Sequence, residues 1–183
     1  MAASVTGPYP PIERWVLSSQ VLGATLDAVR PGARLGVESG VFWMGRRSGV
    51  ATVEAVVMPR PPGVEERPDR WRVSADVYGV IAQWAMPRGL QLLGWVHTHG
   101  QGVPAWLSHA DRTRSIQAPG VLAVVIGSGG DDEDPARWGW YVYEDGDYRD
   151  LEDRERINRV ELCPDGAIQR WRASLAGVVE ESG

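Results

Sequence analysis

The pair His97 and His99, at the end of an apolar run, is the feature that most constrains how this chain folds. The run, residues 90–96, reads LQLLGWV and predicts a strand. Residues two apart in a strand point to the same face and lie about 7 Å apart along the chain, so the two imidazoles can converge on one ion. Buried histidines need polar partners, which makes a role in packing alone a poor explanation for the pair.

A carboxylate follows the pair at a suitable distance. Asp111 comes twelve residues after His99, beyond a loop that contains glycine and proline, and Ser108 precedes it by three. This Ser-x-x-Asp spacing is typical of a first helical turn, so an ordinary helix cap is the alternative interpretation. Two imidazoles and one carboxylate are also a donor set that catalytic zinc uses, with a fourth position left for water. We therefore expect His97, His99 and Asp111 to hold Zn²⁺.

The same residues resemble a known signature. Around His97 and His99, and again from Ser108 to Asp111, the sequence is similar to the zinc motif of the JAMM metalloproteases, also called the MPN-plus family. That motif reads His-(Ser/Thr)-His, seven residues, Ser-x-x-Asp. Eight residues separate His99 from Ser108 here, and Gly100 replaces the usual proline. Because the ligands flank this loop, one further residue within it is readily accommodated.

The resemblance implies both a fold and catalytic roles. The fold would be α/β, a curved mixed β-sheet flanked by helices with the zinc site at the sheet edge. Residues 38–45, ESGVFWMG, are similar to a Glu-x-Gly-x-x-x-x-Gly segment of the family. This similarity gives Glu38 the role of general base, which takes a proton from water and returns it to the leaving amine. Ser108 would help to hold the oxyanion, and Glu54 on the next strand is the alternative acid.

The resemblance, to the prokaryotic-type deconjugating branch of the family, also implies an activity. The chain would be a zinc-dependent isopeptidase or peptidase that removes or processes a ubiquitin-like protein at its C-terminal tail. Its partners would be that protein or its conjugates, with associated activating and conjugating enzymes. Two alternatives stay open: a zinc-free scaffold of the MPN type, and a peptidase of the same family that acts on cell-wall or phage-tail peptides.

Charge and composition limit the other function classes. The 183 residues carry a net charge of −5. Nucleic-acid affinity depends on a clustered basic face, so the acidic balance and the scattered arginines argue against nucleic-acid binding and against the DNA-repair-associated branch of the fold. The single cysteine excludes an intramolecular disulfide and a thiol-rich zinc site. Residues 1–11 lack a secretion signal and no apolar run approaches about 18 residues, so we expect a cytoplasmic protein that is not bound to a membrane.

All nineteen basic residues are arginine and none is lysine. A G/C-rich coding sequence explains this bias and also the single asparagine and single phenylalanine, and it indicates a bacterial source. The alternative is that an enzyme acting on modified lysine amines avoids becoming a target itself.

The length suits one domain over residues 1–183. The resemblance to the JAMM fold implies a core at about 10–145, which leaves a C-terminal hairpin and tail over 146–183. The charged, proline-rich stretch 59–70 is typical of a long surface loop. Two short runs near the C-terminus, 160–162 and 167–171, are expected to form the last hairpin, with a frayed tail after Ala173. Periodicity predicts helices over 11–30 and from Ser74, and strands over 37–46, 50–58, 90–97, 121–126 and 138–144.

Overall fold

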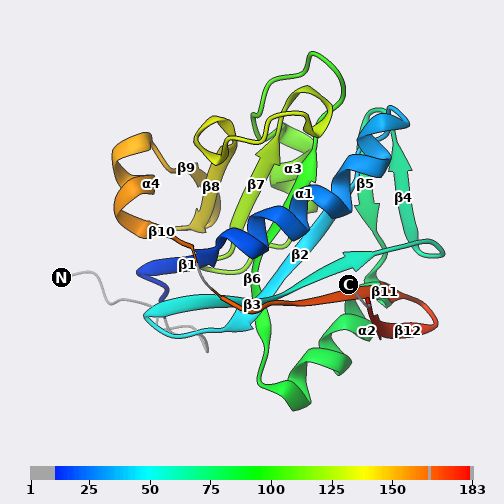
Figure 1. The fold of residues 1–183 in the computed structure, drawn as a ribbon, viewed down its shortest axis with the longest axis horizontal. Coiled ribbons are helices and arrows are strands. Elements are labelled where there is room, and N and C mark those ends of the chain that lie inside the picture. The colour runs from blue at the N-terminus through cyan, green and yellow to red at the C-terminus, as the bar shows by residue number, and fades with distance from the viewer. Residues whose placement is uncertain (1–10, 165, 182–183) are drawn as a thin grey trace.

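One curved, mixed sheet runs through the structure, a computed structural model that describes residues 11–164 and 166–181 (Figure 1). Its strands follow the order β10-β1-β3-β2-β6-β7-β8-β9, with β11 beside β3 and β12 beside β11. Strands β1, β3, β10 and β11 pair in parallel, as do β6 and β7, whereas β2 is antiparallel to both of its neighbours. The strands are β1 (Arg14–Ser18), β2 (Gly40–Arg46), β3 (Val50–Pro59), β6 (Gln91–Thr98), β7 (Leu122–Ile126), β8 (Gly139–Glu144), β9 (Asp147–Asp150), β10 (Val160–Cys163), β11 (Gln169–Ser174) and β12 (Gly177–Glu180).

The helices lie on both faces of the sheet, and alternate strand residues point to different cores. On β2, Val41 and Trp43 join the apolar cluster under α1, whereas Phe42 and Met44 join the cluster that contains α2. This alternation is the two-residue period of a strand that is buried on both faces. The predicted α/β fold, with a curved mixed sheet between helices, is therefore confirmed. The helices are α1 (Ser19–Arg34), α2 (Ala75–Ala85), α3 (His109–Arg114) and α4 (Asp153–Arg159), with short 3₁₀ turns η1 (Met86–Arg88), η2 (Ser128–Gly130) and η3 (Pro135–Arg137).

The N-terminal helix predicted over residues 11–30 is wrong in its first part. A strand, β1, comes first, and Ser18 then caps α1 by accepting a hydrogen bond from Val21 N. Trp15 and Leu17 are fully buried because β1 inserts between β3 and β10. Their spacing of two is a strand signal, but their partners are distant in sequence. Pairing in the sheet therefore overrode the local helical periodicity.

The loop predicted over residues 59–70 is also wrong, because most of it belongs to a hairpin. Strands β4 (Val64–Arg67) and β5 (Arg70–Val73) form a separate two-stranded antiparallel sheet. The ring of Trp71 packs 5.5 Å from that of Phe42, while Glu65 pairs with Arg67 and Arg70. The high charge of the segment led to the prediction of a solvated loop, but these charges pair with one another on the hairpin.

The C-terminal segment does not form the hairpin predicted from residues 160–162 and 167–171. β10 instead adds in parallel to β1, and β11 adds in parallel to β3. The tail after Ala173 is not frayed, since Ala173 pairs with Val178 in the hairpin of β11 and β12. The parallel partners lie more than a hundred residues earlier in the chain, so no local turn signal could identify them.

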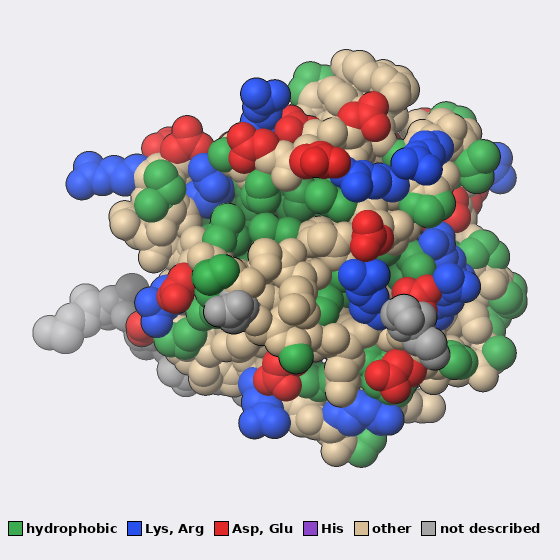
Figure 2. Space-filling model, in the orientation of Figure 1, with side chains coloured by type: hydrophobic (Ala, Val, Ile, Leu, Met, Phe, Trp, Pro, Cys, Tyr) green, Lys and Arg blue, Asp and Glu red, His purple; other side chains and the backbone are tan. Residues whose placement is uncertain are grey.

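Two surface features concern the expected partners and location. On the face drawn in Figure 2, arginines and acidic side chains are interspersed over α1 and the neighbouring strands, and neither sign gathers into one patch. No helix in the described part of the chain has the length and apolar character needed to cross a membrane. The segment 1–10, on which the expected absence of a secretion signal rests, lies outside the described residues.

Candidate metal centre

The end of strand β6 positions both histidines. His97 is next to last in the strand and lies between Gly40 on β2 and Val125 on β7. His99 lies just beyond the strand, where its backbone N–H donates to Ile126 O at 2.9 Å. Both side chains are buried, and their ring centroids are 5.0 Å apart. The two-residue spacing therefore places both imidazoles on one side of the sheet, as predicted.

The start of α3 positions the carboxylate. Ser108 Oγ accepts a hydrogen bond from Asp111 N at 3.1 Å, and Ser108 N donates to Asp111 Oδ2 at 2.9 Å. This reciprocal arrangement is a capping box, which satisfies backbone donors that the first helical turn would leave unpaired. The helix-cap interpretation is thus correct. It also orients Asp111, because the oxygen held by Ser108 N is the one that faces the histidines.

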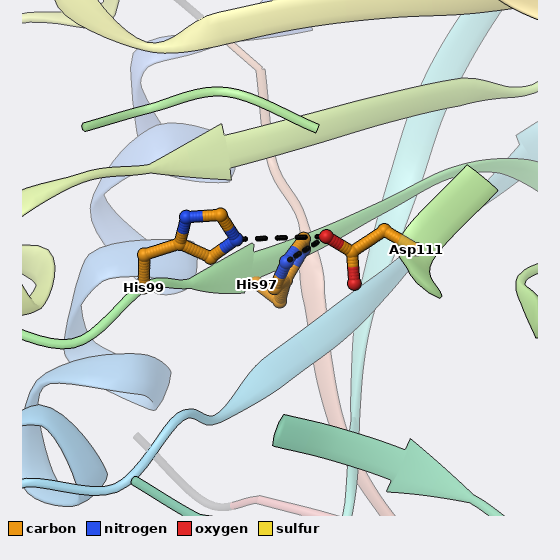
Figure 3. A group of neighbouring side chains, drawn as sticks. All are labelled: His97, His99 and Asp111. Atoms are coloured by element: carbon orange, nitrogen blue, oxygen red, sulfur yellow. Dashed lines mark ion pairs between the residues drawn. The ribbon is translucent and has the colours of Figure 1, made fainter. Parts of the chain in front are cut away.

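The three side chains converge, as Figure 3 shows. Asp111 Oδ2 lies 3.6 Å from Nε2 of His97 and 3.6 Å from Nε2 of His99. One ligand atom from each residue can be chosen so that all lie within 4.8 Å of one another. A separation of 3.6 Å is too long for a hydrogen bond. It is close to the spacing of about 3.3 Å between ligands that each lie 2.0–2.1 Å from one tetrahedral zinc ion.

Unsatisfied nitrogen atoms at His97 support the same conclusion. Within the described part of the chain, neither ring nitrogen of His97 has a hydrogen-bond partner, although both are buried. Native proteins leave few buried polar atoms without a partner. A cation between His97 and Asp111 would satisfy Nε2, so the residues that are present fit a metal ion. His99 differs, because its Nδ1 lies 3.1 Å from Pro104 O.

The protonation states of His97 and Asp111 suit a cation as well. Burial lowers the pKa of His97, which favours the neutral imidazole that a metal needs. Burial also opposes a charge on His99, but Asp111 and Glu38 outweigh it and raise the pKa of His99. For Asp111, burial acts to raise the pKa, but the two neighbouring imidazoles outweigh it and hold the pKa well below its usual range. The carboxylate is therefore ionised at neutral pH.

Glu38 lies in the same cleft, just before β2. The predicted strand 37–46 starts only at Gly40, so Glu38 is in the connection from α1 and its backbone N–H donates to Arg67 O at 2.8 Å. Its side chain is buried, and burial raises its pKa to about 7, with His99 acting in the opposite direction. Glu54, the alternative acid, pairs with Arg46 at 3.3 Å and does not line the cleft.

The cleft over these residues has a volume of about 670 Å³. The hairpin of β4 and β5 forms one wall, and the loop before α3 forms another. Sequence reasoning missed the aromatic residues here, Trp71 on β5, Trp95 on β6 and Tyr78 on α2. The alternation in Arg70–Val73 was the available signal for Trp71, since a tryptophan and a valine there alternate with arginines. The cleft-lining residues include Glu38, Trp71, Tyr78, Trp95, His99, Trp106, Ser108, Asp111 and Arg114.

Comparisons with known proteins add a likeness in fold. No family model matches the sequence, and no curated protein does. Among solved structures, the chain is similar to protein DSY2949 from Desulfitobacterium hafniense, with a TM-score of 0.59 and 17% identity over 82% of this chain and 94% of that one. A JAB1/MPN domain protein from Archaeoglobus fulgidus, AF2198, matches with a TM-score of 0.41 and 14% identity over 85% of this chain and 98% of that one. The likeness to DSY2949 extends to the fold alone, and that to AF2198 is too distant to carry an argument.

Proposed function

We propose that this chain is a zinc-dependent hydrolase that cleaves an amide or isopeptide bond. The observation that carries this proposal is the convergence of His97, His99 and Asp111 at a cleft that His99, Asp111 and the buried Glu38 line. Two imidazoles and one carboxylate leave a position open for water or substrate, which distinguishes catalytic from structural zinc sites. A protein that serves only as a scaffold has no use for a buried His97 whose ring nitrogens lack hydrogen-bond partners, because such burial costs stability.

The roles of the residues follow from their positions. Zinc, when held by the triad, supplies Lewis acidity that polarises the scissile carbonyl and acidifies water. Glu38, with its raised pKa of about 7, accepts a proton from the attacking water and returns it to the departing amine. The Ser108 hydroxyl lines the cleft and uses its oxygen to accept from Asp111 N, so its hydrogen is free to donate to the developing oxyanion.

The substrate class rests on the motif resemblance and on the shape of the cleft wall. We propose the C-terminal tail of a ubiquitin-like protein, presented by the protein itself or by its conjugates. Among the described strands, β5 pairs only with β4, and residues 70–73 all line the cleft. An extended tail can pair with such an open strand edge through its backbone.

Metal content and a single substitution test the catalytic proposal. The wild-type protein should bind one zinc ion per chain and lose activity when a chelator removes it. Glu38→Gln should keep the zinc and lose about 10²–10⁴-fold in turnover, because only the proton carrier is changed. Glu54→Gln, the matched control on β3, should keep both the zinc and the turnover of the wild type. Absence of stoichiometric zinc would favour the zinc-free scaffold, and full activity in zinc-loaded Glu38→Gln would remove the general base from the mechanism.

The substrate is tested separately. Ubiquitin-like proteins extended at the C-terminus, or joined there to a lysine side chain, are incubated with the enzyme and measured by intact mass. We expect a mass loss that corresponds to the extension and that the chelator prevents. Cell-wall peptides incubated in parallel distinguish the alternative, since cleavage of these peptides alone would keep the hydrolase and reject the ubiquitin-like partner.

A further inference from the structure

The orientation of His97 has no hydrogen bond to explain it. Metal-binding histidines usually donate their second ring N–H to a carboxylate or carbonyl group, and this bond fixes the plane of the ring. His99 follows the rule, with Nδ1 at 3.1 Å from Pro104 O. In the described part of the structure Nδ1 of His97 has no such partner, yet its side chain is only 2% exposed and its Nε2 faces Asp111.

Two indole rings contact the imidazole of His97 instead. The ring of Trp95 lies 5.1 Å away, centroid to centroid, at an interplanar angle of 22°. The ring of Trp71 lies 6.5 Å away at 11°. Both distances and both near-parallel angles are those of offset-stacked aromatic pairs. Trp95 comes from the same strand as His97, whereas Trp71 comes from the separate hairpin.

Both indoles are themselves fixed. Trp95 Nε1 donates to Tyr148 OH at 2.8 Å, and that hydroxyl donates onward to Ile116 O. Trp71 is held by packing. It lies over Gly40, where an added Cβ would come within 2.9 Å of the indole ring, so only glycine leaves room for it there.

We propose that Trp71 and Trp95 are positioning residues that fix the plane of the His97 imidazole and keep its Nε2 directed at the metal position. The stacked rings take the place of the absent hydrogen bond. The backbone N–H of Trp71 also acts to lower the pKa of Glu38, so strand β5 lies against both a ligand and the base. The predicted change in zinc affinity rests on the proposed zinc function. The predicted fixed orientation of the His97 ring does not.

Three variants separate stacking from simple burial. Trp71→Phe keeps an aromatic plane, Trp71→Leu keeps an apolar side chain without one, and Trp171→Leu removes a tryptophan that packs against Trp84 at a tilt, away from the cleft. Zinc affinity is measured by competition with a chelator. Because changes to residues that orient metal ligands cost about 10–100-fold in metal affinity, we expect Trp71→Leu to bind zinc at least about 10-fold more weakly. Trp71→Phe and Trp171→Leu should stay close to wild type.

A measurement without metal makes the outcomes distinguishable. NMR couplings of the His97 Hβ protons to Hα and to the ring Cδ2 should report one χ1 rotamer and one χ2 ring orientation in metal-free wild type and Trp71→Phe, and averaged values in Trp71→Leu. If wild type binds no zinc but shows this pattern, the positioning role stands and the hydrolase proposal fails. If wild type binds zinc and Trp71→Leu matches it in affinity and couplings, the positioning role is overturned.

A second variant covers the case in which Trp71→Leu fails to fold. Tyr148→Phe removes the acceptor of Trp95 Nε1 and lies outside the cleft lining. It should weaken zinc binding by about 3-fold or more and broaden the His97 rotamer distribution, because Trp95 is then less firmly held. Unchanged affinity and couplings in this variant would equally overturn the proposal.

Discussion

Ser108 combines a structural and a proposed catalytic role, and suitable substitutions separate the two. Ser108→Ala removes the cap of α3 and should lower the free energy of unfolding by about 1 kcal/mol. Ser108→Asn can still cap the helix, so it should keep most of the stability while turnover falls, because the hydroxyl donor is lost. Urea unfolding and single-turnover rates on zinc-loaded protein measure the two effects. Equal activity in Ser108→Asn and wild type would show that the hydroxyl only caps the helix.

At the scale of single residues, the sequence predicts those features of the site that depend on local spacing along the chain. The convergence of His97 and His99 follows from the two-residue period of a strand, and Asp111 follows from the spacing of a capping box. Trp71 could not be assigned to the site, because it reaches His97 only through the packing of a separate hairpin. The burial of Glu38 likewise depends on that hairpin, which lies about thirty residues later in the chain.

Among the elements, helix α2 offers a test of backbone freedom. Gly79 lies in its middle, and an added Cβ would meet no atom within 4 Å. Gly79→Ala should therefore raise the free energy of unfolding by about 0.5–1 kcal/mol, because alanine loses less conformational entropy in a helix. Gly89, which follows η1 with φ at 67°, is the matched control. Gly89→Ala should destabilise the protein, because that φ strains a residue with a Cβ, and urea unfolding of both variants measures the contrast.

The ion pairs of α4 give a pH-dependent prediction. Glu155 pairs with Arg149 at 2.6 Å and with Arg159 at 3.1 Å, and these bonds, Arg149 first, lower its pKa from 4.5 to about 2. A lowered pKa stabilises the fold in full above pH 4.5, and this contribution is lost as the pH falls toward about 2. In metal-free protein, Glu155→Gln should be less stable than wild type at pH 7 by up to about 1 kcal/mol, since the pairs are partly exposed.

The comparison with wild type across pH checks this result. Urea unfolding at pH 7, 4.5 and 3 should show the stability gap narrowing below pH 4.5, because Glu155 of the unfolded wild type takes up a proton there while the folded state, with a pKa of about 2, still keeps its pairs. Glu152→Gln, at the start of the same helix, is the control and should show no such change, because Glu152 makes no ion pair with Arg149 or Arg159. A gap that stays constant from pH 7 to pH 3 would contradict the assigned role of the network.

Whether an element could be predicted from the sequence likewise depends on whether the contacts that stabilise it are local in the chain. The strands β3, β6, β7 and β8 and the helix after Ser74 were predictable, because each carries its own periodicity and its own start or stop signal. The strands β1, β10 and β11 were not, since each is short and gains its stability from a parallel partner distant in the chain.

For the whole molecule, the candidate metal centre brings together side chains from the sheet and from helix α3. The sheet contributes His97 and His99, and a helix contributes Asp111 from beyond a loop with three glycine or proline residues at its start. The arrangement exists only in the folded chain, because in the unfolded chain the loop no longer holds the carboxylate near the imidazoles. A metal bound here therefore stabilises the folded state by mass action.

This linkage predicts the size of the effect. Zinc at about 100 times its dissociation constant should add about 2.7 kcal/mol to the stability, which for a chain of this length corresponds to a rise of about 5–10 °C in Tm. His97→Ala should abolish the rise, because it removes a ligand. His109→Ala should keep it, because the third histidine is exposed and lies outside the cleft lining. Thermal unfolding with zinc or chelator measures all three proteins, and equal shifts in the two variants would place the ion elsewhere.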